Sequence, residues 1–230
     1  MNRPDLISVI MPVFNSEDTV STAIESIVNQ TFSNFELIIG DDGSDDSTYN
    51  ICKDFEENNE NIKIIKNDKN IGLTKSLNKL IKVAEGNIIA RQDGDDYSSE
   101  NRLQKQLNYL RKNNLDACTT RAKVIGTNRV IPNLSFYLPK KIVMMYKNPF
   151  IHGSLMIKKE VLEEMNFYNE KFYYAQDYKL MFDLLRSKKK ARIMKSNLYF
   201  LNMENNISTI YGEEQKYFSD CVKKNIDPVI

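Results

Sequence analysis

Aspartates gather at two places in the chain, each directly after a short apolar run. Residues 41–46 hold four of them and residues 93–96 hold three. Carboxylates spaced one residue apart, such as Asp93 and Asp95, can hold Mg²⁺ or Mn²⁺, because hard divalent cations prefer oxygen ligands and let phosphate oxygens complete the shell. The chemistry indicated is metal-assisted binding of a diphosphate.

The elements that must position these clusters alternate along the chain. Apolar, β-branched runs at 7–14, 35–39, 62–65 and 87–90 predict buried strands, and amphipathic stripes at 20–28, 48–55 and 73–84 predict the helices between them. Such alternation predicts βαβ units and a parallel sheet with right-handed crossovers. Ligands of open parallel sheets sit beyond the carboxyl ends of the strands, so both acidic clusters are expected at one edge.

The second half has a looser pattern. A helix over 103–110 and a strand over 117–125 follow the regular part, and then Pro132, Pro139 and Pro149 interrupt the alternation. We expect a short helix at 140–147, a strand at 154–157, helices at 159–165 and 177–187, and short strands within 192–203. No linker divides the chain, which predicts a single domain over residues 1–230.

Composition limits the partners. The 230 residues include 32 Lys+Arg and 31 Asp+Glu, a net charge of +1, so no global field attracts nucleic acid. The three cysteines are far apart, which argues against a disulfide framework or a zinc site, and no apolar run approaches the ~18 to 20 residues that cross a bilayer. We therefore expect a cytoplasmic protein that is either soluble or bound to a membrane only at its surface.

Glycine spacing excludes two nucleotide-binding classes. The eight glycines never form G-x-G-x-x-G or G-x-x-x-x-G-K, which argues against dehydrogenases and P-loop NTPases. The phosphates of a bound nucleotide would then depend on a metal at Asp95 and on cations such as Lys75 and Arg91. Residues 41–46 also have a plainer interpretation, because Asp, Gly and Ser form turns and satisfy helix N-termini.

Several segments, taken in order, resemble the family 2 inverting glycosyltransferases, which have the GT-A fold and use nucleoside-diphosphate sugars. The resemblance covers residues 6 to about 210. Its carriers are Ser8-Val9-Ile10-Met11-Pro12-Val13-Phe14-Asn15, Gln30-Thr31-Phe32, Glu36-Leu37-Ile38-Ile39, Asp41-Asp42-Gly43-Ser44, Asn70-Ile71-Gly72-Leu73, Ile89-Ala90-Arg91-Gln92-Asp93-Gly94-Asp95-Asp96, Arg102-Leu103, His152-Gly153-Ser154, Phe172 and Gln176-Asp177-Tyr178-Lys179-Leu180.

The resemblance implies an α/β GT-A fold. Its Rossmann-like, mostly parallel central sheet has helices on both faces, residues 1–125 bind the nucleotide sugar, and residues 126–230 bind the acceptor. It implies a metal-dependent enzyme that moves a sugar, with a UDP-sugar as the favoured donor, to a glycan or lipid-linked acceptor in surface polysaccharide biosynthesis. Mn²⁺ or Mg²⁺ is the implied cofactor.

The implied site roles fall on individual residues of this sequence. Pro12, Phe14 and Asn15 would line the base and ribose pocket, and Asp42 would accept a hydrogen bond from uracil. Asp93 would face the ribose or sugar, Asp95 would hold the metal, and Asp177 would be the general base. A sugar hydroxyl has a pKa far above 7, so its attack on the anomeric carbon requires such a carboxylate.

Departures from the family keep an alternative open. Gln176 stands where the family has Glu, and residues 199–208 lack the Arg-x-His element of many members. A catalytically weak nucleotide-sugar-binding subunit is therefore the alternative function. A sugar-nucleotide pyrophosphorylase would need a Gly-rich, Arg-containing loop after the first strand, where this chain has Pro12 to Asn15.

Two further residues and two segments each allow a structural and a functional interpretation. His152 is expected near the diphosphate or the acceptor, although a lone histidine is more often structural, and Asp177 could be only a helix cap. The basic run 186–192 is more typical of a solvated turn than of a phospholipid contact. The Met and Ile stripe of 140–146 is more typical of core than of a surface beside the acceptor opening.

Overall fold

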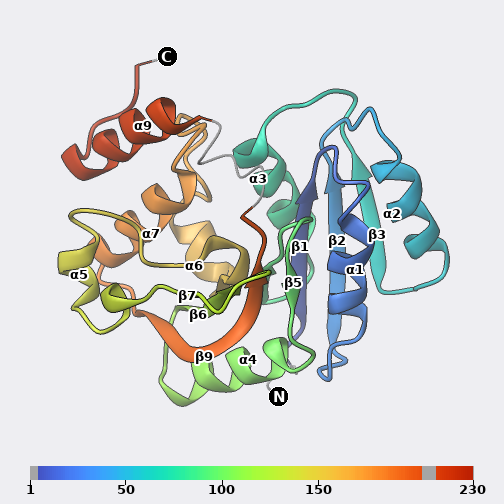
Figure 1. Ribbon diagram of the computed structural model, residues 1–230, viewed down its shortest axis with the longest axis horizontal. Helices are drawn as coiled ribbons and strands as arrows, with labels where there is room; N and C mark the ends of the chain where they lie inside the picture. The colour runs from blue at the N-terminus through green and yellow to red at the C-terminus, as the bar shows by residue number, and fades with distance from the viewer. Residues whose placement is uncertain (1–4, 204–210, 230) are drawn as a thin grey trace.

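The computed structural model describes residues 5–203 and 211–229, which form one curled sheet with helices on both faces (Figure 1). The strand order is β3-β2-β1-β4-β8-β6-β9-β5, and β7 pairs with β6 at the side. This is the mixed α/β architecture expected from the sequence. Residues 204–208, the end of the stretch that lacks the Arg-x-His element, lie outside the described part of the chain.

The first half contains the expected parallel strands. The strands β1 (Ile7–Val13), β2 (Phe35–Asp41), β3 (Ile62–Lys66) and β4 (Ile88–Arg91) pair in parallel in the order β3-β2-β1-β4. They are connected through the helices α1 (Val20–Val28), α2 (Thr48–Glu57) and α3 (Leu73–Val83).

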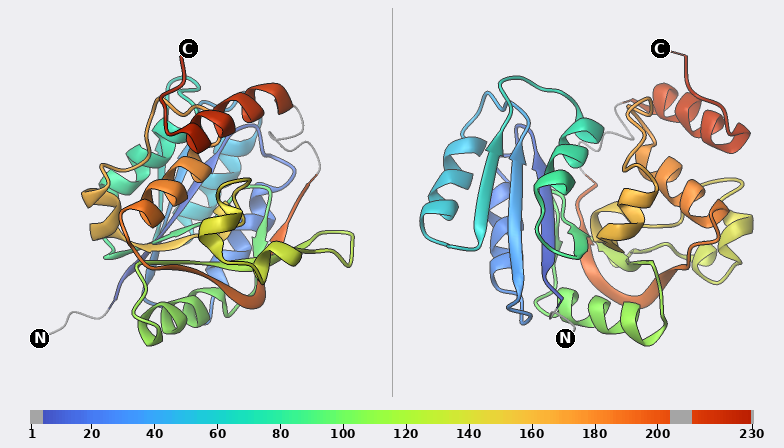
Figure 2. Two further views of the ribbon diagram at one scale, coloured as in Figure 1. Left: turned by 90° about the vertical axis from the view of Figure 1, so that its left-hand side faces the viewer. Right: turned by 180° about the vertical axis from the view of Figure 1, so that it is seen from behind.

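The alternating side chains of these strands fill two cores. Val9 and Met11 of β1 pack with α1 on one face, whereas Ile10 packs with α3 on the other. The views from the front and from behind show α1 and α2 on one side of the sheet and α3 on the opposite side (Figure 2). Strands buried on both faces in this way read as nearly continuous apolar runs, and for that reason the sequence pattern located them.

The second half inserts a strand into the order. The short strand β8 (Met156–Lys158) lies antiparallel between β4 and β6 (Ala117–Val124), so β4 and β6 are not neighbours in the sheet. The short strands expected within 192–203 form one long strand, β9 (Ala191–Leu201), which runs parallel to β6 with a register shift at Arg121. Two-residue strands, β5 (Tyr97–Ser98) and β7 (Val130–Ile131), complete the sheet.

Helices cover this half of the sheet. They are α4 (Arg102–Lys112), α5 (Lys140–Val143), α6 (Lys159–Glu164) and α7 (Gln176–Arg186), with single 3₁₀ turns at η1 (Leu134–Phe136) and η2 (His152–Ser154). A helix that the sequence pattern did not predict, α9 (Gly212–Lys224), packs against α7 near the C-terminus (Figure 1). Across residues 5–203 and 211–229, no helix is both long enough and apolar enough to span a bilayer.

Candidate active site

The carboxyl ends of β1 and β2 meet at the edge where the sequence placed the first acidic cluster. Asp42 is buried, and its Oδ1 accepts hydrogen bonds from Asn67 Nδ2 at 2.8 Å and from the Ile71 amide at 3.0 Å. Its Oδ2 accepts a hydrogen bond from the Gly72 amide at 2.9 Å. The carboxylate therefore ties β2 to the loop that leads into α3, a role that the sequence did not reveal.

The loop after β1 is joined to the loop after β2 by polar contacts. The Asn15 amide donates to Ser44 Oγ and Asn15 Oδ1 accepts from the Asp45 amide, both at 3.0 Å. Asp46 receives the amides of Glu17 and Thr48 at 3.1 and 3.0 Å. Part of this acidic cluster therefore stabilises a turn and the start of α2, which is the structural role that Asp, Gly and Ser residues can have in such a segment.

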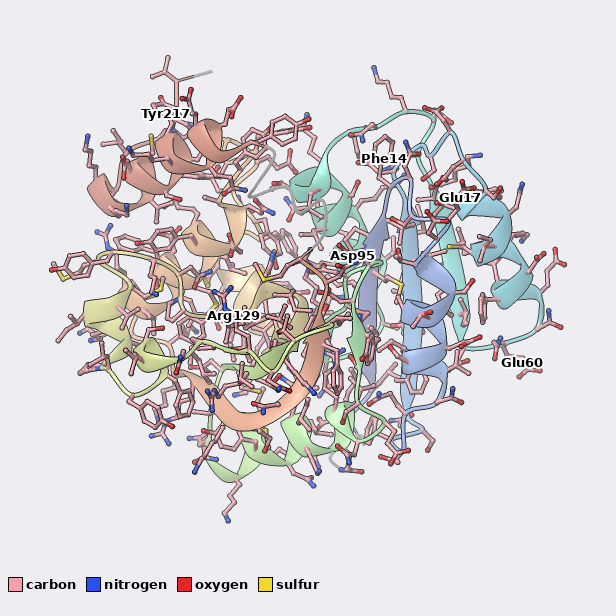
Figure 3. The ribbon with its side chains drawn as sticks, viewed as in Figure 1. Phe14, Glu17, Glu60, Asp95, Arg129 and Tyr217 are labelled. Atoms are coloured by element: carbon pink, nitrogen blue, oxygen red, sulfur yellow. The ribbon has the colours of Figure 1, made fainter. Side chains whose placement is uncertain are left out.

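Aromatic and apolar surface lies beside these loops. Phe14 is 43% exposed at the end of β1, and Pro12 is half-buried just before it. The side-chain view places Phe14 beyond the sheet edge and Asp95 at the junction between the two halves of the molecule (Figure 3). An exposed ring next to polar loop atoms is a surface on which a planar base can stack.

The second acidic cluster follows β4 and is electrostatically crowded. The Asp95 side chain is exposed, but protein surrounds it closely enough that desolvation raises the pKa of Asp95 to about 6, and the Asp93 charge adds to this shift. Asp96 is buried, accepts the Asn202 amide at 2.7 Å, and has a pKa that burial and both neighbouring carboxylates raise. A cation placed at Asp95 would relieve this repulsion.

A buried arginine, Arg91, forms an ion pair with this second acidic cluster. Arg91 Nη2 lies 2.6 Å from Asp93 Oδ1, and its guanidinium is buried. Burial acts to lower the pKa of Arg91, but the nearby negative charges, chiefly that of Asp93 and to a smaller extent that of Asp177, leave this pKa raised. Arg91 therefore lies within electrostatic reach of both the acidic cluster after β4 and the carboxylate at the start of α7.

Tyr199 and Gly153 fix the position of Asp93. The Asp93 amide donates to the hydroxyl of Tyr199 at 3.1 Å, and Tyr199 is fully buried on β9. A Cβ on Gly153 would lie 2.7 Å from Asp93 Oδ2, so only glycine leaves room for this carboxylate. Arg102, also fully buried, donates to the Arg91 carbonyl at 3.0 Å and lies over the Tyr199 ring.

The residues after β4 fit a divalent cation only in part. Within the described part of the chain, no group of three or more His, Cys, Asp or Glu side chains is arranged to hold a metal. Asp95 offers an open carboxylate and Asp93 a second one next to it, and these are the hard oxygen donors that Mg²⁺ or Mn²⁺ takes when substrate phosphates complete the shell. The donor set therefore suits a metal that arrives with a diphosphate.

Asp177 lies in the first turn of α7 and opens into a pocket of about 310 Å³. Its Oδ2 accepts a hydrogen bond from Asn148 Nδ2 at 2.8 Å. Burial raises the pKa of Asp177, whereas Asn148, the Tyr178 amide and the Arg91 charge act in the opposite direction. The residue before α7, Ala175, has φ 53° and provides no side-chain cap, so Asp177 is not the N-cap.

The other predicted site residues lie at different depths. His152 Nε2 is 2.7 Å from the hydroxyl of Tyr168, and burial, together with the Arg91 charge, lowers the pKa of His152 well below 6.5. Gln176 is buried beside Asp177. Lys75 is exposed on α3, and no hydrogen bond or ion pair joins its side chain to another described residue.

The structure thus brings together Arg91, Asp93, His152 and Asp177, and it leaves Lys75 apart. Asn148, Tyr168 and Tyr199 were missed by the sequence analysis, because each is a lone polar residue in the loosely patterned half. The basic run is a turn: Lys189 pairs with Glu164, and Arg192 Nη1 donates to Asn113 Oδ1 at 3.3 Å.

The family model of Glycosyl transferase family 2 matches residues 8–174, which include both acidic clusters and the β8 insertion. The chain belongs to this family. A curated relative, the UDP-Glc:alpha-D-GlcNAc-diphosphoundecaprenol beta-1,3-glucosyltransferase WfgD of Escherichia coli, is 32% identical over 183 residues, which are 79% of this chain and 70% of that protein. The chain spans between 58% and 74% of the length of the first curated relatives that it matches.

Solved structures share the GT-A fold of this family 2 chain. S. aureus TarS 1-349 in complex with UDP-GlcNAc superimposes with a TM-score of 0.75 at 21% identity, over 87% of this chain and 59% of that one. The mannosyltransferase PcManGT from Pyrobaculum calidifontis, in complex with GDP-Man and Mn²⁺, gives a TM-score of 0.74 at 15% identity, over 96% of this chain and 65% of that one.

Proposed function

We propose that the chain is an inverting glycosyltransferase that transfers a sugar from a nucleoside-diphosphate sugar, in first place a UDP-sugar, to a hydroxyl of a glycan or lipid-linked acceptor in surface polysaccharide biosynthesis. The observation that carries the proposal is the position of Asp177. This carboxylate faces a pocket, is oriented by Asn148, and shares the electrostatic field of Arg91 with Asp93.

In the proposed reaction, Asp177 is the general base. Its Oδ2 accepts a hydrogen bond from Asn148, and the carboxylate would take the proton of the acceptor hydroxyl. The acceptor oxygen forms a bond to the anomeric carbon from the face opposite the diphosphate. The bond from that carbon to the diphosphate oxygen breaks, and its electron pair leaves with the diphosphate. One displacement of this kind inverts the anomeric configuration without a protein nucleophile.

The donor would be held by the edge of the sheet. Pro12, Phe14 and Asn15 would line the base and ribose pocket, with Phe14 offering the exposed ring, and the remaining lone-pair capacity of Asp42 would face the base. Lys75 would neutralise diphosphate charge from α3.

Mn²⁺ or Mg²⁺ would be held by Asp95 with Asp93 beside it, and when bound it would act as a Lewis acid on the leaving diphosphate. Arg91 would act through Asp93, because its guanidinium is buried against that carboxylate.

The acceptor would enter the pocket at Asp177. The pocket is lined on one side by Lys147 and on the other by Lys216 and Lys223 of α9, which suits an acceptor that carries anionic groups. His152 and Gln176 would lie at the junction between the donor and acceptor sides. The acceptor named for WfgD, a sugar linked to diphosphoundecaprenol, has this character, and it supports a protein that works at the inner face of the membrane.

Two matched pairs of variants test the proposal. Asp95→Ala should abolish the Mn²⁺-dependent part of UDP binding measured by calorimetry, whereas Glu60→Ala, at the opposite end of the sheet (Figure 3), should leave it unchanged. Asp177→Asn should keep UDP binding and lower sugar transfer by about 10² to 10⁴, whereas Asp183→Asn on the same helix should not. Unaltered metal-dependent affinity in Asp95→Ala would refute the metal assignment.

The second candidate, a nucleotide-sugar-binding subunit, rests on the buried Gln176 beside Asp177. A screen of UDP-, GDP- and dTDP-sugars for metal-dependent hydrolysis separates the two functions. If UDP binds with Mn²⁺, no donor is turned over, and Asp177→Asn changes nothing, then the chain binds nucleotide sugars without transferring them.

A further inference from the structure

One short segment, residues 134–146, exposes an unusual amount of apolar surface. Six of its large hydrophobic side chains are between 53% and 78% exposed, namely those of Leu134, Tyr137, Leu138, Ile142, Met145 and Tyr146. The segment includes η1 and α5 and lies at the edge of the molecule farthest from β3 (Figure 1). Apolar residues concentrated in this way mark an interaction site, whereas single exposed ones do not.

The protein holds this segment in place from within. Val143 and Met144 are buried, and the hydroxyl of Tyr178 donates to the Met144 carbonyl. Lys140 Nζ donates to the carbonyls of Ser135 and Leu138 at 3.0 and 2.9 Å, which ties η1 to α5. The outward position of the apolar side chains is therefore fixed by the backbone and is a property of the fold.

The helical turn around α5 has two different faces. Ile142, Met145 and Tyr146 follow the i, i+3, i+4 spacing of one helical face, and this face is the exposed one. The expectation that the Met and Ile stripe of 140–146 forms core is therefore wrong for Ile142 and Met145 and correct for Met144. The inner face is filled, so the outer face is available to a binding partner.

Charge points to the kind of partner. Residues 117–159 contain eight Lys and Arg and no Asp or Glu, although the whole chain has a net charge of only +1. Lys141 and Lys147 are exposed within or directly after the apolar segment. Basic side chains around projecting apolar ones are the combination that binds the interface of an anionic bilayer.

We propose that residues 134–146 form a membrane-docking surface, which inserts its six apolar side chains into the interface of an anionic lipid bilayer while Lys141 and Lys147 contact the headgroups. A second copy of the chain is a poorer partner, because two such surfaces would bring like charges together. The basic turn 186–192, the other candidate for lipid contact, has no exposed large hydrophobic residue.

The membrane-docking surface lies next to the pocket of Asp177. Tyr146 and Lys147 also line the pocket of Asp177, so a docked protein would open this pocket at the bilayer surface. This consequence rests on the proposed function, since it assumes a lipid-linked acceptor. Vesicle binding itself does not depend on nucleotide or transfer.

Co-sedimentation of the full chain with vesicles tests the surface. We expect binding to phosphatidylglycerol–phosphatidylethanolamine vesicles, weaker binding at high salt, and little binding to phosphatidylcholine vesicles. The double variant Leu134→Ser/Ile142→Ser should lower the apparent affinity about tenfold or more, and Val83→Ser, an exposed apolar residue on α3, should not. Lys141→Gln/Lys147→Gln should also weaken binding, in contrast to Lys188→Gln/Lys190→Gln in the basic turn.

Each other outcome overturns the proposal. It fails if the wild-type protein does not bind anionic vesicles, or if Lys188→Gln/Lys190→Gln loses as much binding as Lys141→Gln/Lys147→Gln. It also fails if light scattering shows a dimer that Leu134→Ser/Ile142→Ser converts to a monomer. Circular dichroism and Mn²⁺-dependent UDP binding of the serine variant control for folding. A protein that binds vesicles but no nucleotide would refute the proposed function and leave the docking surface intact.

Discussion

Gly153 lies against both Tyr199 and Asp93, and its replacement by alanine should lower the unfolding free energy by a predictable amount. A Cβ at this position would clash first with the Tyr199 hydroxyl oxygen, and it would lie 2.6 Å from Tyr199 Cζ and 2.7 Å from Asp93 Oδ2, whereas ordinary contact begins near 3.4 Å. Tyr199 is fully buried and has the Arg102 guanidinium over its ring, so the phenol cannot swing into solvent. Tyr199 and Asp93 must therefore both shift, or the backbone of Gly153 must move away from them.

The magnitude follows from overpacking and a lost hydrogen bond. Forcing an extra carbon into a filled core costs about 1–3 kcal/mol, and displacing the Tyr199 hydroxyl from the Asp93 amide costs about 1 kcal/mol. We expect Gly153→Ala to lose about 2–3 kcal/mol of unfolding free energy and about 5–10 °C in Tm. Gly212→Ala is the matched control, because no atom lies within 4 Å of its added Cβ.

Thermal unfolding followed by circular dichroism measures this effect without any ligand. Tyr199→Phe removes the crowding hydroxyl, so the double variant should be more stable than the sum of the two single changes by about 1 kcal/mol. If Gly153→Ala melts within 1 °C of wild type, or if the two changes are strictly additive, the site is not packed as described.

Three further predictions concern the carboxylates and the thiols. Asp42→Ala removes the acceptor of the Ile71 amide and one of the two acceptors of Asn67 Nδ2 and of the Gly72 amide, and it should cost about 2–4 kcal/mol in urea unfolding. Asp45→Ala, at an exposed site, should stay within about 0.5 kcal/mol. Burial raises the pKa of Asp177 in the folded state above its ordinary value of 3.8. Between these two pKa values the folded protein binds more protons than the unfolded one, so the unfolding free energy falls as the pH rises through this range. Asp177→Asn should remove this part of the pH dependence, and an identical slope of Tm against pH would contradict it. All three cysteines are buried, and burial raises the pKa of Cys52 and Cys118 to about 12, so a thiol reagent should label none of them until urea unfolds the chain.

The parallel half of the fold could be predicted from the sequence because its signals are local. The apolar runs of β1 and β2 and the stripes of α1 and α3 each lie within one short window. The insertion of β8 between β4 and β6 could not be predicted, because three residues of pairing carry little pattern and the partners are distant in sequence. Helix α9 was missed because its apolar face is narrow.

The site was predictable where the chemistry is concentrated in one turn. Asp93 and Asp95 lie in one short motif, and the sequence located both. The partners Asn148 and Tyr199 come from other elements, and only the fold brings them to Asp177 and Asp93. The exposed Ile142 and Met145 were missed because hydrophobic spacing does not indicate which face of a turn meets solvent.

The placement of Tyr199 on β9 also bears on how the protein is made. In a chain emerging from the ribosome, β1, β2, β3 and β4 are complete well before Tyr199 is added. Asp93 lacks its anchor until β9 arrives beside β6, after most of the chain has been translated. Nascent chains arrested before β9 should therefore lack a working donor site, so that only a nearly finished polypeptide binds nucleotide sugar.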